Sequence, residues 1–161
     1  MAKTFVNQTA ISAPAQLLYD VYSGSLIVWP DGGYGGQQIL STPGWAEGSY
    51  MVMESPAAPP AGTYNVWGTW ITHGRPQQFG HGTSTGGWAG WTPVSLDAPV
   101  AAFTEGGMPF QLLGQVVCTG SNKIRLGVTW PSDAAGYGCI DAFAYELVPA
   151  APAQSPVLLM V

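Results

Sequence analysis

Aromatic side chains beside polar ones, in stretches rich in glycine, are the residues of this chain that could do chemistry. The apolar C–H faces of sugars stack on Trp and Tyr rings, and sugar hydroxyls need polar partners for hydrogen bonds. The candidate rings are Tyr34, Trp45, Trp88, Trp91, Trp130 and Tyr137. The polar residues expected near them are His73, Gln78, His81, Asn122 and Asp133. This pattern allows a glycan-binding surface, but a Trp in such a stretch also commonly folds back over the core.

The carboxylates and histidines form no pattern that predicts an enzyme. A glycosidase needs two carboxylates on either side of a sugar, and the four glutamates are scattered along the chain at Glu47, Glu54, Glu105 and Glu146. Glu54 and Glu146 fall in predicted strands, where we expect them to be exposed. The two histidines, His73 and His81, have no nucleophile beside them and no third ligand at zinc spacing. We therefore expect a non-enzymatic protein.

The composition predicts one folded domain with an unusually neutral surface. The chain has 161 residues, of which 47% are hydrophobic and only 8% are charged, against a usual charged share of about 25%. Twenty-two Gly and fourteen Pro favour many short strands joined by tight turns. A soluble monomer normally keeps its surface charged. The low charge therefore indicates either that other subunits cover much of the surface or that uncharged polar side chains, exposed to water, make it up.

Charge and hydropathy exclude some partners. The four basic residues and the net charge of −5 do not suit a nucleic-acid partner, because phosphate binding needs clustered Lys and Arg. No apolar run reaches the length of a membrane span, and the first residues contain no apolar core of a signal peptide.

Alternating patterns predict strands. Residues 63–72 place Tyr64, Val66 and Trp70 on one face and a second Trp on the other, which indicates a central strand covered on both sides. In residues 123–130 the residues Ile124, Leu126, Val128 and Trp130 share one face. We interpret 110–118 and 123–130 as a hairpin, 73–90 as a long glycine-rich loop and 139–148 as the last strand. Cys118 and Cys139 fall in strands, either bridged or as two buried thiols.

The fold class that follows is all-β, a two-sheet antiparallel jelly-roll sandwich with extended N- and C-terminal arms. The predicted boundaries are an N-terminal arm over 1–18, the jelly-roll domain over 19–148 and an apolar C-terminal arm over 149–161.

From Tyr34 onward, the order of short motifs resembles the galactose-binding-like jelly rolls, with carbohydrate-binding modules of families six and thirty-five as the nearest types. The motifs are Gly35-Gly36-Gln37-Gln38-Ile39, Ala61-Gly62-Thr63-Tyr64-Asn65-Val66, Trp88-Ala89-Gly90-Trp91, Leu112-Leu113-Gly114, Ile124-Arg125-Leu126-Gly127-Val128 and Ile140-Asp141-Ala142-Phe143. The resemblance as a whole extends over about three quarters of the chain.

The resemblance implies a glycan-binding cleft at the loop end of the sandwich. It would use Tyr34, Asn122 and either Trp88 or Trp91, and Trp130 is a further candidate. Family members open with an acidic strand that helps to hold a structural calcium, but this chain has Leu18-Tyr19-Asp20 there. Since calcium needs six or more oxygen ligands, we expect no cofactor, and Asp141 is expected to cap a turn.

The two arms suggest a role in assembly. Apolar residues at Phe5, Val6, Val157, Leu158, Leu159 and Met160 would be covered by a neighbouring subunit. The leading interpretation is a virion structural protein of the capsid decoration, cement or fibre type. It would form a homo-oligomer that contacts neighbouring coat subunits and would keep some glycan affinity at its exposed loops. The alternative is a stand-alone carbohydrate-binding module, and a glycan-processing enzyme is third. The leading interpretation implies a location in a virion assembled in the host cytoplasm, with an extracellular location as the alternative.

Overall fold

The computed structural model describes residues 2–7, 17–20, 26–29, 34, 38–41, 50–70, 77–94, 99–129 and 139–150. These residues form three antiparallel sheets and contain no helix that could cross a membrane. The first sheet has the order β1 (Thr4–Asn7), β13 (Ala142–Leu147), β6 (Gly62–Thr69), β10 (Met108–Cys118), β9 (Phe103–Glu105). The second has the order β2 (Leu17–Asp20), β5 (Tyr50–Glu54), β11 (Ile124–Thr129), β7 (Gln77–Thr83), β8 (Gly87–Val94).

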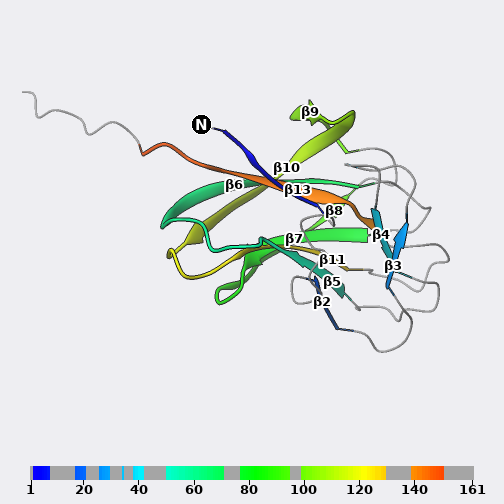
Figure 1. The fold of residues 1–161 in the computed structure, drawn as a ribbon, viewed down its shortest axis with the longest axis horizontal. Coiled ribbons are helices and arrows are strands. Elements are labelled where there is room, and N and C mark those ends of the chain that lie inside the picture. Colours follow the sequence, from blue (N-terminus) through cyan, green and yellow to red (C-terminus); the bar gives the residue numbers. More distant parts are fainter. Residues whose placement is uncertain are drawn as a thin grey trace, which may run out of the picture.

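These two five-stranded sheets pack face to face as a sandwich, and the small third sheet lies at one end of it (Figure 1). The third sheet has the order β12 (Cys139–Ile140), β4 (Gln38–Ser41), β3 (Leu26–Trp29). The predicted all-β sandwich with antiparallel sheets is therefore confirmed, and the architecture is consistent with a jelly roll.

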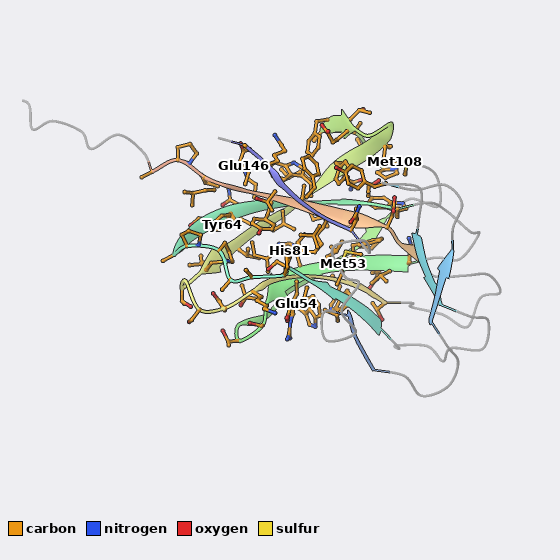
Figure 2. All side chains as sticks on the ribbon, viewed as in Figure 1. Met53, Glu54, Tyr64, His81, Met108 and Glu146 are labelled. Atoms are coloured by element: carbon orange, nitrogen blue, oxygen red, sulfur yellow. The ribbon has the colours of Figure 1, made fainter. Side chains whose placement is uncertain are left out.

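The core lies between the two large sheets, where Figure 2 shows His81 and Met53. Tyr64 and Val66 face the core from β6, while Trp67 of the same strand faces outward and is also buried. This confirms the predicted central strand covered on both sides. On β11 the alternating residues Ile124, Leu126 and Val128 are fully buried, as their spacing predicts. Cys118 is a buried, free thiol.

The predicted hairpin of 110–118 with 123–130 is wrong. β10 pairs with β6 and β9 in the first sheet, whereas β11 pairs with β5 and β7 in the second. The turn between them crosses from one sheet to the other. Two strands of one hairpin and two strands of opposite sheets show the same alternation in sequence, because in both cases each strand turns one face toward the core.

The predicted loop over 73–90 is also wrong in its described part. Residues 77–83 and 87–94 are the strands β7 and β8 of an antiparallel hairpin. Phe79 and His81 are buried, and the alternate positions 80 and 82 are both glycine. Because those outward positions carry no side chain, the polar half of the alternation is missing and the strand looks like a loop.

The first sheet carries a second, smaller cluster of rings on its outer face. We call Phe5, Tyr34, Trp67, Phe103 and Phe110 the outer aromatic cluster. Trp67 and Phe110 are buried in it, and Ala142 and Ala144 of β13 leave room for the rings. The rings of Phe103 and Phe110 stack with centroids 5.0 Å apart. Their strands are joined by Gly106 and Gly107, both at positive φ, as a two-residue hairpin turn requires.

Candidate functional site

Trp88 and Trp91 lie side by side on the outer face of the second sheet. A spacing of three would normally place two strand residues on opposite faces. Here the register shifts between His81 and Gly82, so that Trp91 pairs with Gly80 and Trp88 pairs with Gly82. The irregularity therefore brings both indoles to one face, with ring centroids 4.9 Å apart and planes tilted by 45°.

The two indoles rest on glycines of the neighbouring strands. Three ring atoms of Trp91 lie 2.9–3.0 Å from the position that a Cβ at Gly80 would take. At Gly127 of β11 a Cβ would lie 2.6 Å from the tip of Trp88 and 3.0 Å from the tip of Trp91. Both indoles are half-buried rather than enclosed. We call Trp88, Trp91, Gly80, Gly82 and Gly127 the tryptophan face.

An ion-paired cluster lies in the same cross-strand row as Trp88. The registers place Glu54 opposite Arg125, Arg125 opposite Gly82, and Gly82 opposite Trp88. Arg125 Nε donates a hydrogen bond to Glu54 Oε2 at 2.7 Å, and Lys123 Nζ is 3.1 Å from Glu54 Oε1. The expected exposed position of Glu54 is wrong, since this residue is only 6% exposed. The two cations explain why a carboxylate is tolerated there.

The arrangement suits binding of a sugar ring. The half-buried indoles offer apolar faces, and Arg125 retains guanidinium N–H groups beyond its Nε bond to Glu54. Among the described residues, no group of three His, Cys, Asp or Glu side chains could hold a metal ion. The ion-paired cluster is a feature that the sequence interpretation missed. Its only sequence signal is Lys123 and Arg125 on one face of a strand, because the partner Glu54 is 69 or more positions away.

Tyr34 is not near the tryptophan face. It belongs to the outer aromatic cluster, where its ring stacks on Phe5 with centroids 5.6 Å apart and meets Phe110 edge-on at 5.5 Å. That cluster covers the outer face of the first sheet, whereas the tryptophan face is on the outer side of the second. The predicted loop-end cleft that joins Tyr34 to Trp88 or Trp91 is therefore wrong.

Asn122 closes a turn and is not available to a glycan. It is 3% exposed, and its Oδ1 accepts hydrogen bonds from the backbone N–H of Thr119 at 2.8 Å and from the Thr119 hydroxyl at 3.1 Å. Asparagine commonly holds turns in this way. Trp130, the last predicted glycan contact, lies outside the described residues.

The two N-terminal assembly candidates pack inside this chain. Residues 4–7 of the predicted arm are the edge strand β1, paired with β13. Val6 is fully buried in the core and Phe5 packs in the outer aromatic cluster. Val6 is therefore not accessible to a neighbouring subunit, which corrects the prediction for this residue. Val157, Leu158, Leu159 and Met160 lie outside the described residues, and the remaining domain boundaries stay predictions.

Asp141 is a buried carboxylate between β12 and β13. Its two oxygens accept the backbone N–H of Tyr34 at distances of 3.0 Å and 2.8 Å. Burial raises the pKa of Asp141 to about 7, although the hydrogen bond from Tyr34 opposes this shift. The residue thus ties the Tyr34 segment to the last strand of the first sheet. Asp141 thus accepts a backbone N–H, as a turn cap does, but the N–H belongs to a residue 107 positions away in the chain and not to a local turn.

His81 connects the two sheets from inside the core. Its side chain hydrogen-bonds to the backbone of Gln115 on β10, and a Cβ at Gly114 would lie 2.5 Å from its Nε2. Burial lowers the pKa of His81, so the neutral ring is favoured. His81 is thus a core residue that fastens β10 to β7, and not a loop residue beside a sugar.

No protein-family model matches this sequence, and no curated protein matches it either. Solved structures do match its fold. A Paenibacillus xanthan lyase superposes with a TM-score of 0.64 at 20% identity, over 91% of this chain and 13% of the lyase. A family 35 carbohydrate-binding module from Clostridium thermocellum superposes with a TM-score of 0.52 at 14% identity, over 92% of this chain and 100% of the module.

The enzymatically active domain of bacteriophage CBA120 tailspike protein 4 also superposes, with a TM-score of 0.52 at 12% identity. That match covers 89% of this chain and 21% of the tailspike chain. This chain therefore spans a small part of two of these proteins and the whole of the third. At such low identities the matches establish the fold, which is the jelly-roll type of β-sandwich found among carbohydrate-binding modules.

Proposed function

We propose that this chain is a non-catalytic glycan-binding jelly roll that holds its ligand on the tryptophan face. The observation that carries the proposal is the pair of half-buried indoles on the outer side of the second sheet. A core Trp such as Trp70 is only 1% exposed and stacks on Phe79 between the sheets. Trp88 and Trp91 instead keep part of their surface in water, which suits stacking of sugar rings. The likeness to a carbohydrate-binding module supports this role.

The test is binding to a panel of neutral and acidic polysaccharides, xanthan included, followed by calorimetry with any ligand found. We expect Trp88→Ala and Trp91→Ala each to weaken binding at least about tenfold, which is about 1.4 kcal/mol. Gly127→Leu keeps both indoles but lifts their tips from the sheet, and we expect a similar loss. The matched control is Tyr34→Ala, which removes a half-buried ring from the other sheet and should leave binding unchanged. A panel without any ligand would sink the proposal.

A second candidate function is a virion structural protein of the decoration, cement or fibre type. The likeness to part of a phage tailspike and the charged share of only 8% favour it. We expect such a protein to form a trimer or larger oligomer over the concentration range in which it assembles. Mass measurement in solution at several concentrations tests this. A monomer at every concentration, with no incorporation into particles, would argue against it and leave the glycan-binding proposal intact.

A further inference from the structure

We propose that the segment Val157–Val161 of the same chain docks as an added strand on the free edge of β10. This inference does not depend on the glycan-binding proposal. It rests on four features of the described residues, which concern the edge of β10, its exposed apolar side chains, a hollow beside it and the place where the described chain ends.

The first feature is an edge without a partner. On one side β10 pairs with β6 over residues 111–118. On its other side, β9 covers only residues 108–110. Among the described strands, none pairs with the second edge of β10 beyond Phe110, although the side chain of His81 hydrogen-bonds to the backbone of Gln115 within this stretch. Such an edge exposes backbone N–H and C=O groups that can accept a further strand.

The second feature is the distribution of exposed apolar side chains. The described residues include three large hydrophobic side chains that are strongly exposed: Val100 (73%), Leu112 (50%) and Val117 (69%). Leu112 and Val117 belong to β10 itself. Val100 lies next to this strand, since its N–H donates to Gln111 Oε1 at 2.9 Å. An apolar strip along an open edge marks a surface that another segment covers.

The third feature is a hollow of about 320 Å³ beside this edge. It lies between residues 115–117 of β10 and the tip of the β7–β8 hairpin, where Gly82, Gly86 and Gly87 line it. Because these glycines carry no side chains, the hollow can receive side chains from a strand beside β10. Such a strand would need apolar residues on both of its faces, one face toward the hollow and one beside Leu112 and Val117. The segment Val-Leu-Leu-Met-Val is apolar at all five positions.

The fourth feature is where the described chain leaves the sandwich. After β13, the Val148 N–H donates to Thr63 O, and Thr63 pairs with Val117 of β10. Pro149 and Ala150 line a second hollow of about 510 Å³ that shares Gln115 with the first. The described part of the chain thus ends beside β6, which separates it from β10, and at the same end of the sheet as Val117.

Direction and reach both allow docking within one chain. β13 and β10 are each antiparallel to β6, so they run in the same direction. A segment that turns back after Ala150 therefore runs antiparallel to β10. It must cross about 14 Å from β13 to the position outside β10, and residues 151–156 span up to about 20 Å. A tether of this length gives an effective concentration in the millimolar range, which favours the chain's own segment over a second copy.

The test is amide hydrogen exchange on the intact chain and on a variant that lacks residues 157–161. We expect those amides of residues 112–117 that point away from β6 to exchange about tenfold faster in the variant, while core amides of β6 and β13 stay unchanged as the internal reference. Leu159→Asp should have the same effect, because it places a charge in the hollow or in the apolar strip. The matched control is Ser155→Asp, which adds the same charge in the connection and should leave the exchange as in the intact chain.

Exchange must also be measured at low and high protein concentration, with the mass determined at each. Protection that is the same at both, in a monomer, supports docking within one chain. The proposal would be overturned if residues 112–117 became protected from exchange only as a dimer or larger oligomer forms. The edge of β10 would then bind a segment from another copy. Equal exchange in the intact chain and in the shortened variant would overturn it as well.

Discussion

Replacing Phe110 with alanine is expected to lower the free energy of unfolding by about 3–5 kcal/mol. Phe110 is fully buried, although it lies on the outer face of the first sheet rather than between the sheets. Its ring contacts those of Phe5, Tyr34 and Phe103, with centroid distances of 5.5, 5.5 and 5.0 Å. Removing it leaves a cavity between the three segments that carry these rings, and denaturant unfolding measures the loss.

The matched control for Phe110→Ala is Leu112→Ala, two positions along the same strand. Leu112 is 50% exposed, so its truncation should cost less than about 1 kcal/mol. The outer aromatic cluster also holds Lys3, whose Nζ lies 5.1 Å from the Trp67 ring centroid, 4.8 Å from that of Phe103 and 3.5 Å from Glu146 Oε2. Equal, small effects of Phe110→Ala and Leu112→Ala would contradict the view that this cluster is a second core.

The second large effect concerns pH. Burial raises the folded-state pKa of Asp141 from 3.8 to about 7. Between these values the unfolded chain has lost the Asp141 proton while the folded chain still binds it, so stability falls as pH rises. The contribution is fully present below pH 3.8 and is lost as pH rises through about 7. Since one pKa unit corresponds to about 1.4 kcal/mol, the change is on the order of a few kcal/mol.

The measurement is the free energy of unfolding as a function of pH for the wild type and for Asp141→Asn. The amide keeps an oxygen for the Tyr34 N–H but does not ionise, so the variant should lack the decrease toward neutral pH. His81 acts in the opposite direction in both proteins. Its lowered pKa contributes stability that is present above pH 6.5 and lost as pH falls. The difference between the two curves isolates Asp141, and parallel curves would refute its assignment as a buried group with a raised pKa.

Local patterns determined the strands that have side chains on both faces. The alternation of Ile124, Leu126 and Val128 predicted a strand that buries one face, because a period of two reports burial directly. The same signal identified β6 as central and covered twice. It failed in β7, where glycine at positions 80 and 82 removes the outward side chains and leaves nothing for the pattern to show. The composition predicted an all-β chain because glycine, proline and aromatic residues favour strands and turns over helices.

Only the tertiary structure decided which distant residues become neighbours. The register shift near His81 puts Trp88 and Trp91 on one face, and no spacing rule could predict an irregularity in pairing. The partner of Arg125 is Glu54, which a cross-strand register brings beside it. Tyr34 and Asn122, which sequence order placed with the indoles, lie in the outer aromatic cluster and in a turn. Sequence patterns report which face a residue occupies, whereas its neighbours depend on how distant strands pair and how the two sheets pack.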